Sequence, residues 1–302
     1  MPAFRNRMWD GKIRLYSQKT KEIYFGLYPY IRAFAEERGY QIVTGKDVEI
    51  ENKVDKDIVT KFSNSLGQSF EARDYQIDAI YHSLKYNRTL LLSPTASGKS
   101  FIIYSLIRYY SHLIKDETNN RILLIVPTTS LVEQMYSDFQ SYGWNVKKNC
   151  HRLYSGYSNQ TDKKVLISTW QSLYKLPKKY FEQFGVVFGD EAHLFKSKSL
   201  TEIMTKLEDC KYRIGLTGTL DGAQTHKLVL EGLFGAVNKV TSTRKLMDKK
   251  QLSNLVVRCL ILKHTAENSK MVVNGKYQDE IDYLVSSKSR QNFIKNLALK
   301  LK

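Results

Sequence analysis

A short apolar run, a loop of small residues and a helical segment follow one another in a way that strongly restricts the fold of this chain. Residues 89–92 (TLLL) suit a buried strand, and residues 93–100 read SPTASGKS. The residues from Lys99 to about Ile114 then read as a helix. A loop in this setting can bind phosphate through its backbone N–H groups and through the positive end of the following helix. The segment therefore predicts a phosphate-binding loop at the edge of a sheet.

The residues of this loop suit a nucleoside triphosphate and its Mg²⁺ ion. Gly98 lets the backbone approach the phosphates, Lys99 reaches the β and γ oxygens, and the Ser100 hydroxyl can ligate Mg²⁺. The general pattern has a glycine five residues before Gly98, where this chain has Ser93. An ordinary strand–helix turn is the alternative. The loop residues expected to bind the nucleotide are Thr95, Ala96, Ser97, Gly98, Lys99 and Ser100.

An acidic pair follows another apolar run further along the chain. Residues 186–189 (VVFG) lead directly into Asp190 and Glu191. Ligands gather at the carboxyl edge of parallel strands, so we expect Asp190 to hold Mg²⁺ together with Ser100. Glu191 would orient or deprotonate the attacking water, so that Lys99, Asp190 and Glu191 form the expected catalytic set. A solvated acidic pair at the start of a loop is the alternative.

Between residues 70 and 240, short apolar runs alternate with helical segments. The runs cover residues 89–92, 122–126, 165–168, 186–188 and 213–217. Runs this apolar are typical of parallel strands that are buried on both faces. The alternation predicts an α/β domain in which helices cover both faces of a parallel sheet.

The flanking regions differ from this pattern, so we expect three parts. A small α+β accessory domain would cover residues 1–65, the nucleotide-binding domain 66–240, and a basic segment 241–302. The expected flanking elements are strands at 12–16 and 22–27, a helix that ends near Gly39, a linker or surface helix over 45–61, a strand at 256–262 and a helix at 289–301.

The charge of the chain indicates a polyanionic partner. Its 47 Lys and Arg residues exceed its 30 Asp and Glu residues by 17, and nucleic acid is the simplest partner for such an excess. A basic but unspecialised surface is the alternative. The spacing of Cys150, Cys210 and Cys259 suits neither a zinc site nor a disulfide framework. No run approaches the roughly 20 apolar residues of a membrane span, so we expect a cytoplasmic protein with no membrane partner.

Residues 190–193 read DEAH. This motif, and the order in which it follows the phosphate-binding loop, resemble those of the superfamily 2 helicases and translocases. The resemblance covers residues 70–240 and implies a RecA-like P-loop NTPase lobe that uses ATP and Mg²⁺. In this superfamily a small residue other than glycine often stands at the position of Ser93. The resemblance assigns Arg73 and Gln76 to the adenine-reading motif, and His193, Thr217, Gly218 and Thr219 to the layer that couples nucleotide state to the grip on nucleic acid.

Two surfaces are expected to contact nucleic acid. The first lies in the two strand-contacting motifs that the resemblance implies, where hydroxyl side chains suit phosphate oxygens. Its residues are Thr128, Thr129, Ser168, Thr169 and the neighbouring Trp170. Trp170 stacks on a base in one interpretation and belongs to the core in the other. The second surface is an N-terminal basic patch formed by Arg5, Arg7, Lys12, Arg14, Lys19 and Lys21, with Phe4, Trp9 and Tyr16 interleaved. A solvated face is the alternative for this patch.

Residues 9–15 and 25–27 resemble the N-terminal domain of the phage recombination helicases within this superfamily. The resemblance implies ATP-driven unwinding and branch migration of branched DNA. We expect branched or duplex DNA as the partner, with single-stranded DNA as an alternative. Roughly 60 residues follow residue 240, so we expect the second motor lobe and its arginine finger to be absent from this chain and turnover of ATP to be slow. The alternatives are a non-hydrolysing ATP- and DNA-binding module and the motor subunit of a restriction complex.

Overall fold

The computed structural model describes residues 12–45, 51–115, 118–253, 258–273 and 275–300. They form two compact units, and the boundary lies between Leu252 and Ser253. The first unit contains the sheet and the phosphate-binding loop.

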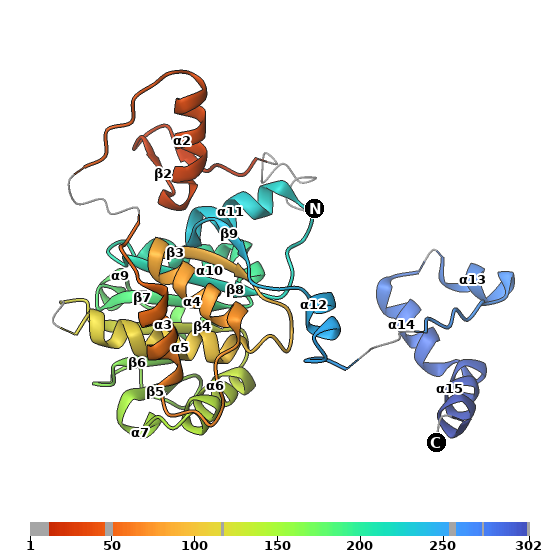
Figure 1. Cartoon of the computed structure of the whole chain (residues 1–302). Coiled ribbons are helices and arrows are strands. Elements are labelled where there is room, and N and C mark those ends of the chain that lie inside the picture. The colour runs from red at the N-terminus through yellow and green to blue at the C-terminus, as the bar shows by residue number, and fades with distance from the viewer. Residues whose placement is uncertain (1–11, 46–50, 116–117, 254–257, 274, 301–302) are drawn as a thin grey trace. The chain divides into compact units, whose positions relative to one another are not determined.

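The predicted parallel sheet is confirmed, and the five apolar runs are its five central strands (Figure 1). Seven strands pair in parallel in the order β5-β6-β4-β7-β8-β3-β9. Their bounds are β3 (Arg88–Leu92), β4 (Arg121–Val126), β5 (Cys150–Leu153), β6 (Val165–Thr169), β7 (Phe184–Asp190), β8 (Tyr212–Thr217) and β9 (Val237–Lys239). The sequence does not predict the two edge strands, β5 and β9, which are short and partly polar.

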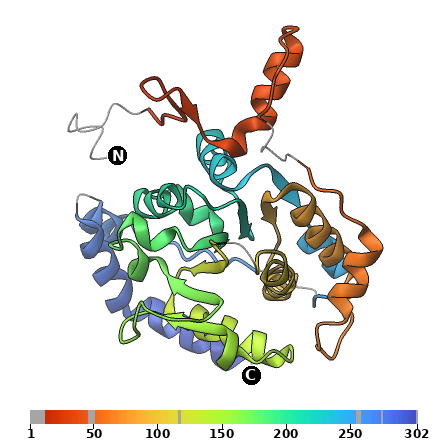
Figure 2. The same ribbon diagram turned by 90° about the vertical axis from the view of Figure 1, so that its left-hand side faces the viewer.

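Helices cover both faces of the sheet, as Figures 1 and 2 show. The helices of this unit that follow the N-terminal segment are α3 (Lys56–Asn64), α4 (Asp74–Tyr86), α5 (Lys99–Leu113), α6 (Thr129–Ser141), α7 (Val146–Asn149), α8 (Trp170–Leu173), α9 (Lys178–Phe181), the 3₁₀ helix η2 (Ala192–Lys196), α10 (Lys198–Lys206), α11 (Gln224–Phe234) and α12 (Thr243–Asp248). Alternate strand residues enter two separate cores. Leu91 and Leu124 pack with α4, α5 and α6, whereas Leu90 and Leu123 pack with α8, α10 and α11.

The N-terminal segment contains β1 (Tyr16–Ser17), β2 (Glu22–Ile23), the 3₁₀ helix η1 (Phe25–Leu27) and α2 (Tyr28–Glu37). The predicted strand at 12–16 is wrong for residues 12–15, because pairing of the exposed hairpin is confined to two residues on each strand. Contacts with α11 hold the segment on the α/β domain that contains the sheet (Figure 2). A Cβ on Gly26 would lie 1.9 Å from the carbonyl oxygen of Glu231, so only glycine permits this approach.

The second unit contains α13 (Ala266–Val272), α14 (Tyr277–Ser286) and α15 (Lys288–Lys300). The helix expected near residue 289 is present as α15. The strand expected at 256–262 is wrong for residues 258–262, which pair with no strand in the described chain and expose Ile261; residues 256 and 257 lie outside the described residues. No helix in the described ranges is both long and apolar enough to cross a membrane.

Candidate active site

The loop between β3 and α5 has a backbone that only glycine permits at one position. Gly98 has a φ of +79°, and a Cβ there would lie 2.3 Å from Nε2 of Gln76. Gln76 is buried, and its Nε2 donates a 3.0 Å hydrogen bond to the carbonyl oxygen of Ser97. Its Oε1 accepts a 2.9 Å hydrogen bond from the backbone N–H of Arg73. The predicted adenine-reading residue therefore ties the start of α4 to the phosphate-binding loop.

Ser93 stands where the general motif has glycine, and the structure explains why glycine is not needed. The backbone of Ser93 lies outside the left-handed region. Its buried hydroxyl lies 2.6 Å from Oγ of Ser97, which donates in turn to the carbonyl oxygen of Pro94 at 2.6 Å. The strained position is Ala96, whose φ of +64° costs an alanine about 1 kcal/mol relative to glycine.

The lysine of the loop and the acidic motif meet at the carboxyl edge of the sheet. Nζ of Lys99 lies 2.9 Å from Oε1 of Glu191, and Oε2 of Glu191 lies 3.3 Å from Nδ1 of His193. Glu191 adopts this position with a φ of +48° directly after β7. In this conformation the carboxylate of Glu191 neutralises Lys99.

Asp190 ends β7 as a buried carboxylate that is 4% exposed. Among the described residues, no donor lies within hydrogen-bond distance of its Oδ1. Burial raises the pKa of Asp190, and the nearby charge of Lys99 lowers it by a smaller amount. A buried carboxylate oxygen without a donor can accept a cation, and Mg²⁺ prefers oxygen ligands. Asp190 therefore fits the predicted metal-binding role.

Ser100, the second predicted Mg²⁺ ligand, contacts two residues that the sequence does not single out. Its Oγ lies 3.0 Å from the hydroxyl of Tyr142. Burial raises the pKa of Asp138, and a hydrogen bond with Ser100 offsets part of that rise. Asp138 and Tyr142 come from the C-terminal end of α6. No motif marks the end of that helix, so its approach to the loop follows only from the tertiary fold.

The predicted coupling residues lie in one hydrogen-bonded layer next to the loop. Nδ1 of His193 lies 2.9 Å from Oγ1 of Thr217, which donates to the carbonyl oxygen of Thr219 at 2.9 Å. The backbone N–H of Ser93 donates to the carbonyl oxygen of Thr217 at 2.8 Å. A Cβ on Gly218 would lie 3.8 Å from the carbonyl oxygen of Ser93. A displacement of the loop would therefore reach His193 through direct contacts.

The predicted nucleic-acid contacts fall into two groups. Thr128 and Thr129 are exposed at the N-terminal end of α6. Ser168 and Thr169 are buried, and the Ser168 hydroxyl lies 3.0 Å from the carbonyl oxygen of Leu153. The fold covers both side chains and uses their hydroxyls, since Oγ1 of Thr169 lies 3.1 Å from Oγ of Ser172, so their contact with phosphate stays a prediction.

Trp170, for which stacking and packing are the two interpretations, is partly buried against the core that includes Leu200. The core interpretation therefore describes Trp170. In the N-terminal basic patch, Lys12, Arg14, Lys19 and Lys21 are exposed. Tyr16 of the patch is exposed as well, and its members Phe4, Arg5, Arg7 and Trp9 lie outside the described residues.

Comparison with known proteins places this site in a family. The family model described as "Type III restriction enzyme, res subunit" matches residues 69–222, which include both motifs and the coupling layer. The chain is 31% identical over 309 aligned residues to the ATP-dependent DNA helicase uvsW of Enterobacteria phage T4. That alignment covers 99% of the chain and 61% of the helicase, so the chain spans less than two thirds of this relative.

One further relative and one solved structure agree with this placement. The chain is 26% identical over 178 residues to the DNA 3'-5' translocase XPB2 of Sulfurisphaera tokodaii, covering 58% of the chain and 36% of the translocase. A crystal structure of the UvsW helicase from bacteriophage T4 superposes with a TM-score of 0.70 at 33% identity, covering 79% of the chain and 86% of that structure. The RecA-like helicase fold of the motor domain is thereby shown.

Proposed function

Because the chain belongs to the family described as the type III restriction enzyme res subunit, within the superfamily 2 helicases, we propose that it is the nucleotide-binding motor lobe of an ATP-dependent DNA helicase or translocase. The observation that carries the proposal is the meeting of Lys99, Asp190 and Glu191 at one edge of the sheet. The phage helicase and the Sulfurisphaera tokodaii translocase are both named for their action on DNA, which supports DNA as the partner of this chain.

The geometry supports a separate role for each residue around the triphosphate. Lys99 and the N–H groups at the start of α5 would bind the phosphates. Ser100 and Asp190 would hold Mg²⁺, which when bound neutralises charge that develops on the phosphate oxygens. Gln76 donates a hydrogen bond to the phosphate-binding loop and would also contact the adenine base. Each of these residues acts by position and charge.

Glu191 has a different task in each state of the site. With Lys99 at 2.9 Å it serves as a counter-charge. Once phosphate oxygens bind Lys99, they replace the carboxylate and leave Glu191 to orient or deprotonate a water. His193 contacts both Glu191 and Thr217, so the same displacement would be passed to the coupling layer.

Phosphate release from ATP in the presence of single-stranded, duplex or branched DNA tests this function. We expect slow hydrolysis that DNA stimulates and that Lys99→Ala removes, and a branch-migration assay is run beside it. ATP binding without hydrolysis under all of these conditions would instead identify a non-hydrolysing ATP- and DNA-binding module.

The description of the matching family favours one second candidate, the motor subunit of a restriction complex. Such a subunit would translocate along duplex DNA and depend on a nuclease that cleaves phosphodiester bonds. A branched substrate with ATP separates the two, because a recombination helicase moves the branch point, whereas a restriction motor translocates along unbranched duplex.

A further inference from the structure

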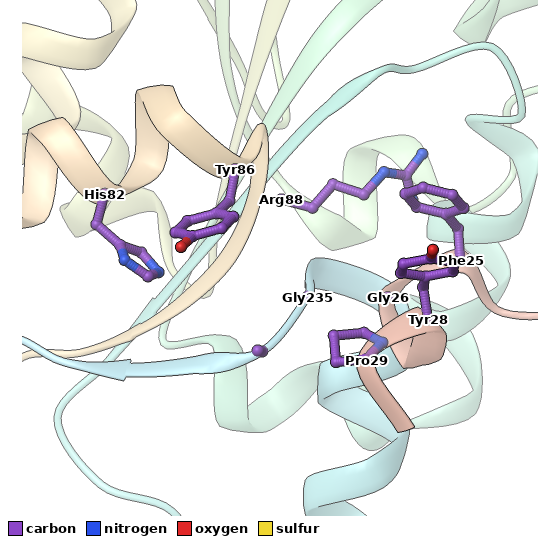
Figure 3. Close-up of a pocket in the computed structure, with 9 residues that line it drawn as sticks. Phe25, Gly26, Tyr28, Pro29, His82, Tyr86, Arg88 and Gly235 are labelled. Carbon is purple, nitrogen blue, oxygen red and sulfur yellow. The ribbon is translucent and has the colours of Figure 1, made fainter. Parts of the chain in front are cut away.

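An open pocket of about 290 Å³ lies between the N-terminal segment and the motor domain (Figure 3). Phe25, Tyr28 and Pro29 line it from the N-terminal segment, and His82 and Tyr86 line it from the last two turns of α4. The pocket adjoins Arg88 at the beginning of β3, whereas the phosphate-binding loop follows the end of that strand. Five residues of strand separate the two places by about 15 Å, so the pocket is distinct from the nucleotide site.

The walls of the pocket are aromatic on both sides. The rings of Phe25 and Tyr28 are nearly parallel, with an interplanar angle of 16° and centroids 6.0 Å apart. On the other side the rings of His82 and Tyr86 lie 4.7 Å apart. Figure 3 shows these two pairs on separate elements, with the pocket between them. Such walls suit a planar ring, which can stack on either side.

The pocket is also lined by Arg88, whose positive charge has no carboxylate partner among the described residues. The guanidinium of Arg88 lies 5.2 Å from the ring centroid of Phe25 and donates to the carbonyl oxygen of Cys210 at 3.2 Å. Arg213, its neighbour across β3 and β8, is also buried, but it does not line the pocket and donates to the carbonyl oxygens of Met204, Leu207 and Cys210. No described carboxylate lies within 4.0 Å of either guanidinium. Burial and the charge of Arg213 lower the pKa of Arg88 to about 10, so an anion in the pocket would be favourable.

Close backbone contacts hold the two sides of the pocket in place. Gly26 packs its backbone against Glu231, and the hydroxyl of Tyr30 donates to the carboxylate of Glu231 at 2.7 Å. Gly235 has a φ of +115°, and a Cβ there would lie 2.4 Å from the carbonyl oxygen of Arg88. The pocket is therefore formed before any ligand arrives, which lowers the entropic cost of binding.

We propose that this pocket binds an unpaired nucleotide of a DNA strand, with the base between the aromatic walls and a phosphate near Arg88. The proposal rests on the proposed function, because it takes the DNA on which the motor acts as the source of the nucleotide. Two observations favour a nucleotide over an apolar side chain. An apolar occupant would leave Arg88 without a counter-anion, because its described hydrogen-bond acceptor is the carbonyl oxygen of Cys210, and the net charge of +17 favours a polyanion.

A single fluorescent base tests the proposal with the full chain. The probe is an oligonucleotide with one 2-aminopurine in an unpaired position, whose emission falls when the base stacks on aromatic side chains. We expect quenching by the wild-type chain, and Phe25→Leu or Tyr86→Leu to weaken binding about five- to hundredfold, the range for loss of one base–aromatic stack. Phe34→Leu is the matched control, because Phe34 is an exposed aromatic of α2 that does not line the pocket.

A second variant tests the charge. We expect Arg88→Gln to weaken oligonucleotide binding and to reduce its dependence on salt, because one phosphate contact is lost. Arg88 is largely buried, so thermal melting is measured first. If Arg88→Gln does not fold, the variants of the partly exposed rings decide the question.

Four results would overturn the proposal. If Phe25→Leu and Tyr86→Leu bind DNA with wild-type affinity and quenching, the pocket is excluded as the nucleotide site and the proposed motor function still stands. Failure of the wild-type chain to bind any DNA would exclude both. Equally tight binding of free 2-aminopurine nucleotide would identify a small-molecule site. Loss of binding of a hydrophobic dye in Phe25→Leu, with DNA binding unchanged, would identify an apolar occupant.

Discussion

Nζ of Lys99 and Oε1 of Glu191 lie 2.9 Å apart although 92 residues separate them in the sequence. The contact joins the start of α5 to the end of β7 and neutralises the lysine that phosphate would otherwise bind. A triphosphate must therefore compete with Glu191 for Lys99. The carboxylate of Glu191 thus occupies the place of a phosphate at Lys99. Binding of the triphosphate would release Glu191, which is needed for hydrolysis.

Glu191→Gln should separate binding from chemistry. The amide removes the competing negative charge, so we expect affinity for a fluorescent ATP analogue to stay the same or rise by a few-fold. DNA-stimulated phosphate release should fall by about 10² to 10⁴, because the amide cannot act as a base. Loss of nucleotide binding in this variant would contradict the role assigned to Glu191.

Ala96→Gly should stabilise the chain. The φ of +64° at Ala96 costs about 1 kcal/mol, and glycine adopts this conformation without that cost. We expect the melting temperature to rise by about 2–4 °C. Ala223→Gly is the control, because Ala223 has a φ of −79° and gains nothing from glycine. An equal change in the two variants would show that the backbone at Ala96 is not strained.

Tyr142→Phe should change how the site responds to Mg²⁺. The hydroxyl of Tyr142 lies 3.0 Å from Oγ of Ser100 and competes with the metal for that oxygen. We expect the Mg²⁺ concentration needed for half-maximal nucleotide binding to fall, by about fivefold for the loss of a hydrogen bond worth about 1 kcal/mol. Titration of Mg²⁺ at fixed nucleotide measures this, and Tyr40→Phe, an exposed tyrosine outside the site, is the control.

Tyr30→Phe should weaken the attachment of the N-terminal segment in a pH-dependent way. Burial, with a hydrogen bond to Glu231, raises the pKa of Tyr30 from 10.0 to about 12. The folded chain therefore holds this proton more tightly than the unfolded chain, so the stabilisation is complete below pH 10 and is lost as the pH rises through about 12.

Urea unfolding of the wild-type chain and of Tyr30→Phe at several pH values measures this effect. The difference in the free energy of unfolding should be about 1 kcal/mol at neutral pH, because solvent screens this partly exposed contact, and should shrink above pH 10. A difference that does not change across this range would show that the hydroxyl makes no selective contact with Glu231.

The central strands could be predicted because they are buried on both faces and read as continuous apolar runs. β5 contains His151 and Arg152, and β9 contains Asn238 and Lys239, because an edge strand packs on fewer neighbours and tolerates polar residues. Residues 258–262 show the opposite error. Their apolar character predicts a strand, but a strand needs a partner, and sequence periodicity does not reveal whether one is present.

The candidate site could be predicted where chemistry fixes both residue type and spacing, as at Lys99 and Asp190. Contacts that depend on how elements pack could not be predicted. Tyr142 reaches Ser100 only because α6 ends beside α5. Ser168 has the residue type of a phosphate contact, but its position at the buried end of β6 turns its hydroxyl toward Leu153.

The affinity of the chain for ATP, measured with and without Mg²⁺ in the wild type, Lys99→Ala and Asp190→Asn, tests the central claim most directly. The account predicts Mg²⁺-dependent binding that Lys99→Ala weakens by at least about tenfold, the loss expected from one charge-assisted contact. It also predicts that Asp190→Asn removes the Mg²⁺ dependence, because the buried Oδ1 loses its charge. Equal affinity in all three proteins, with the same response to Mg²⁺, would contradict it.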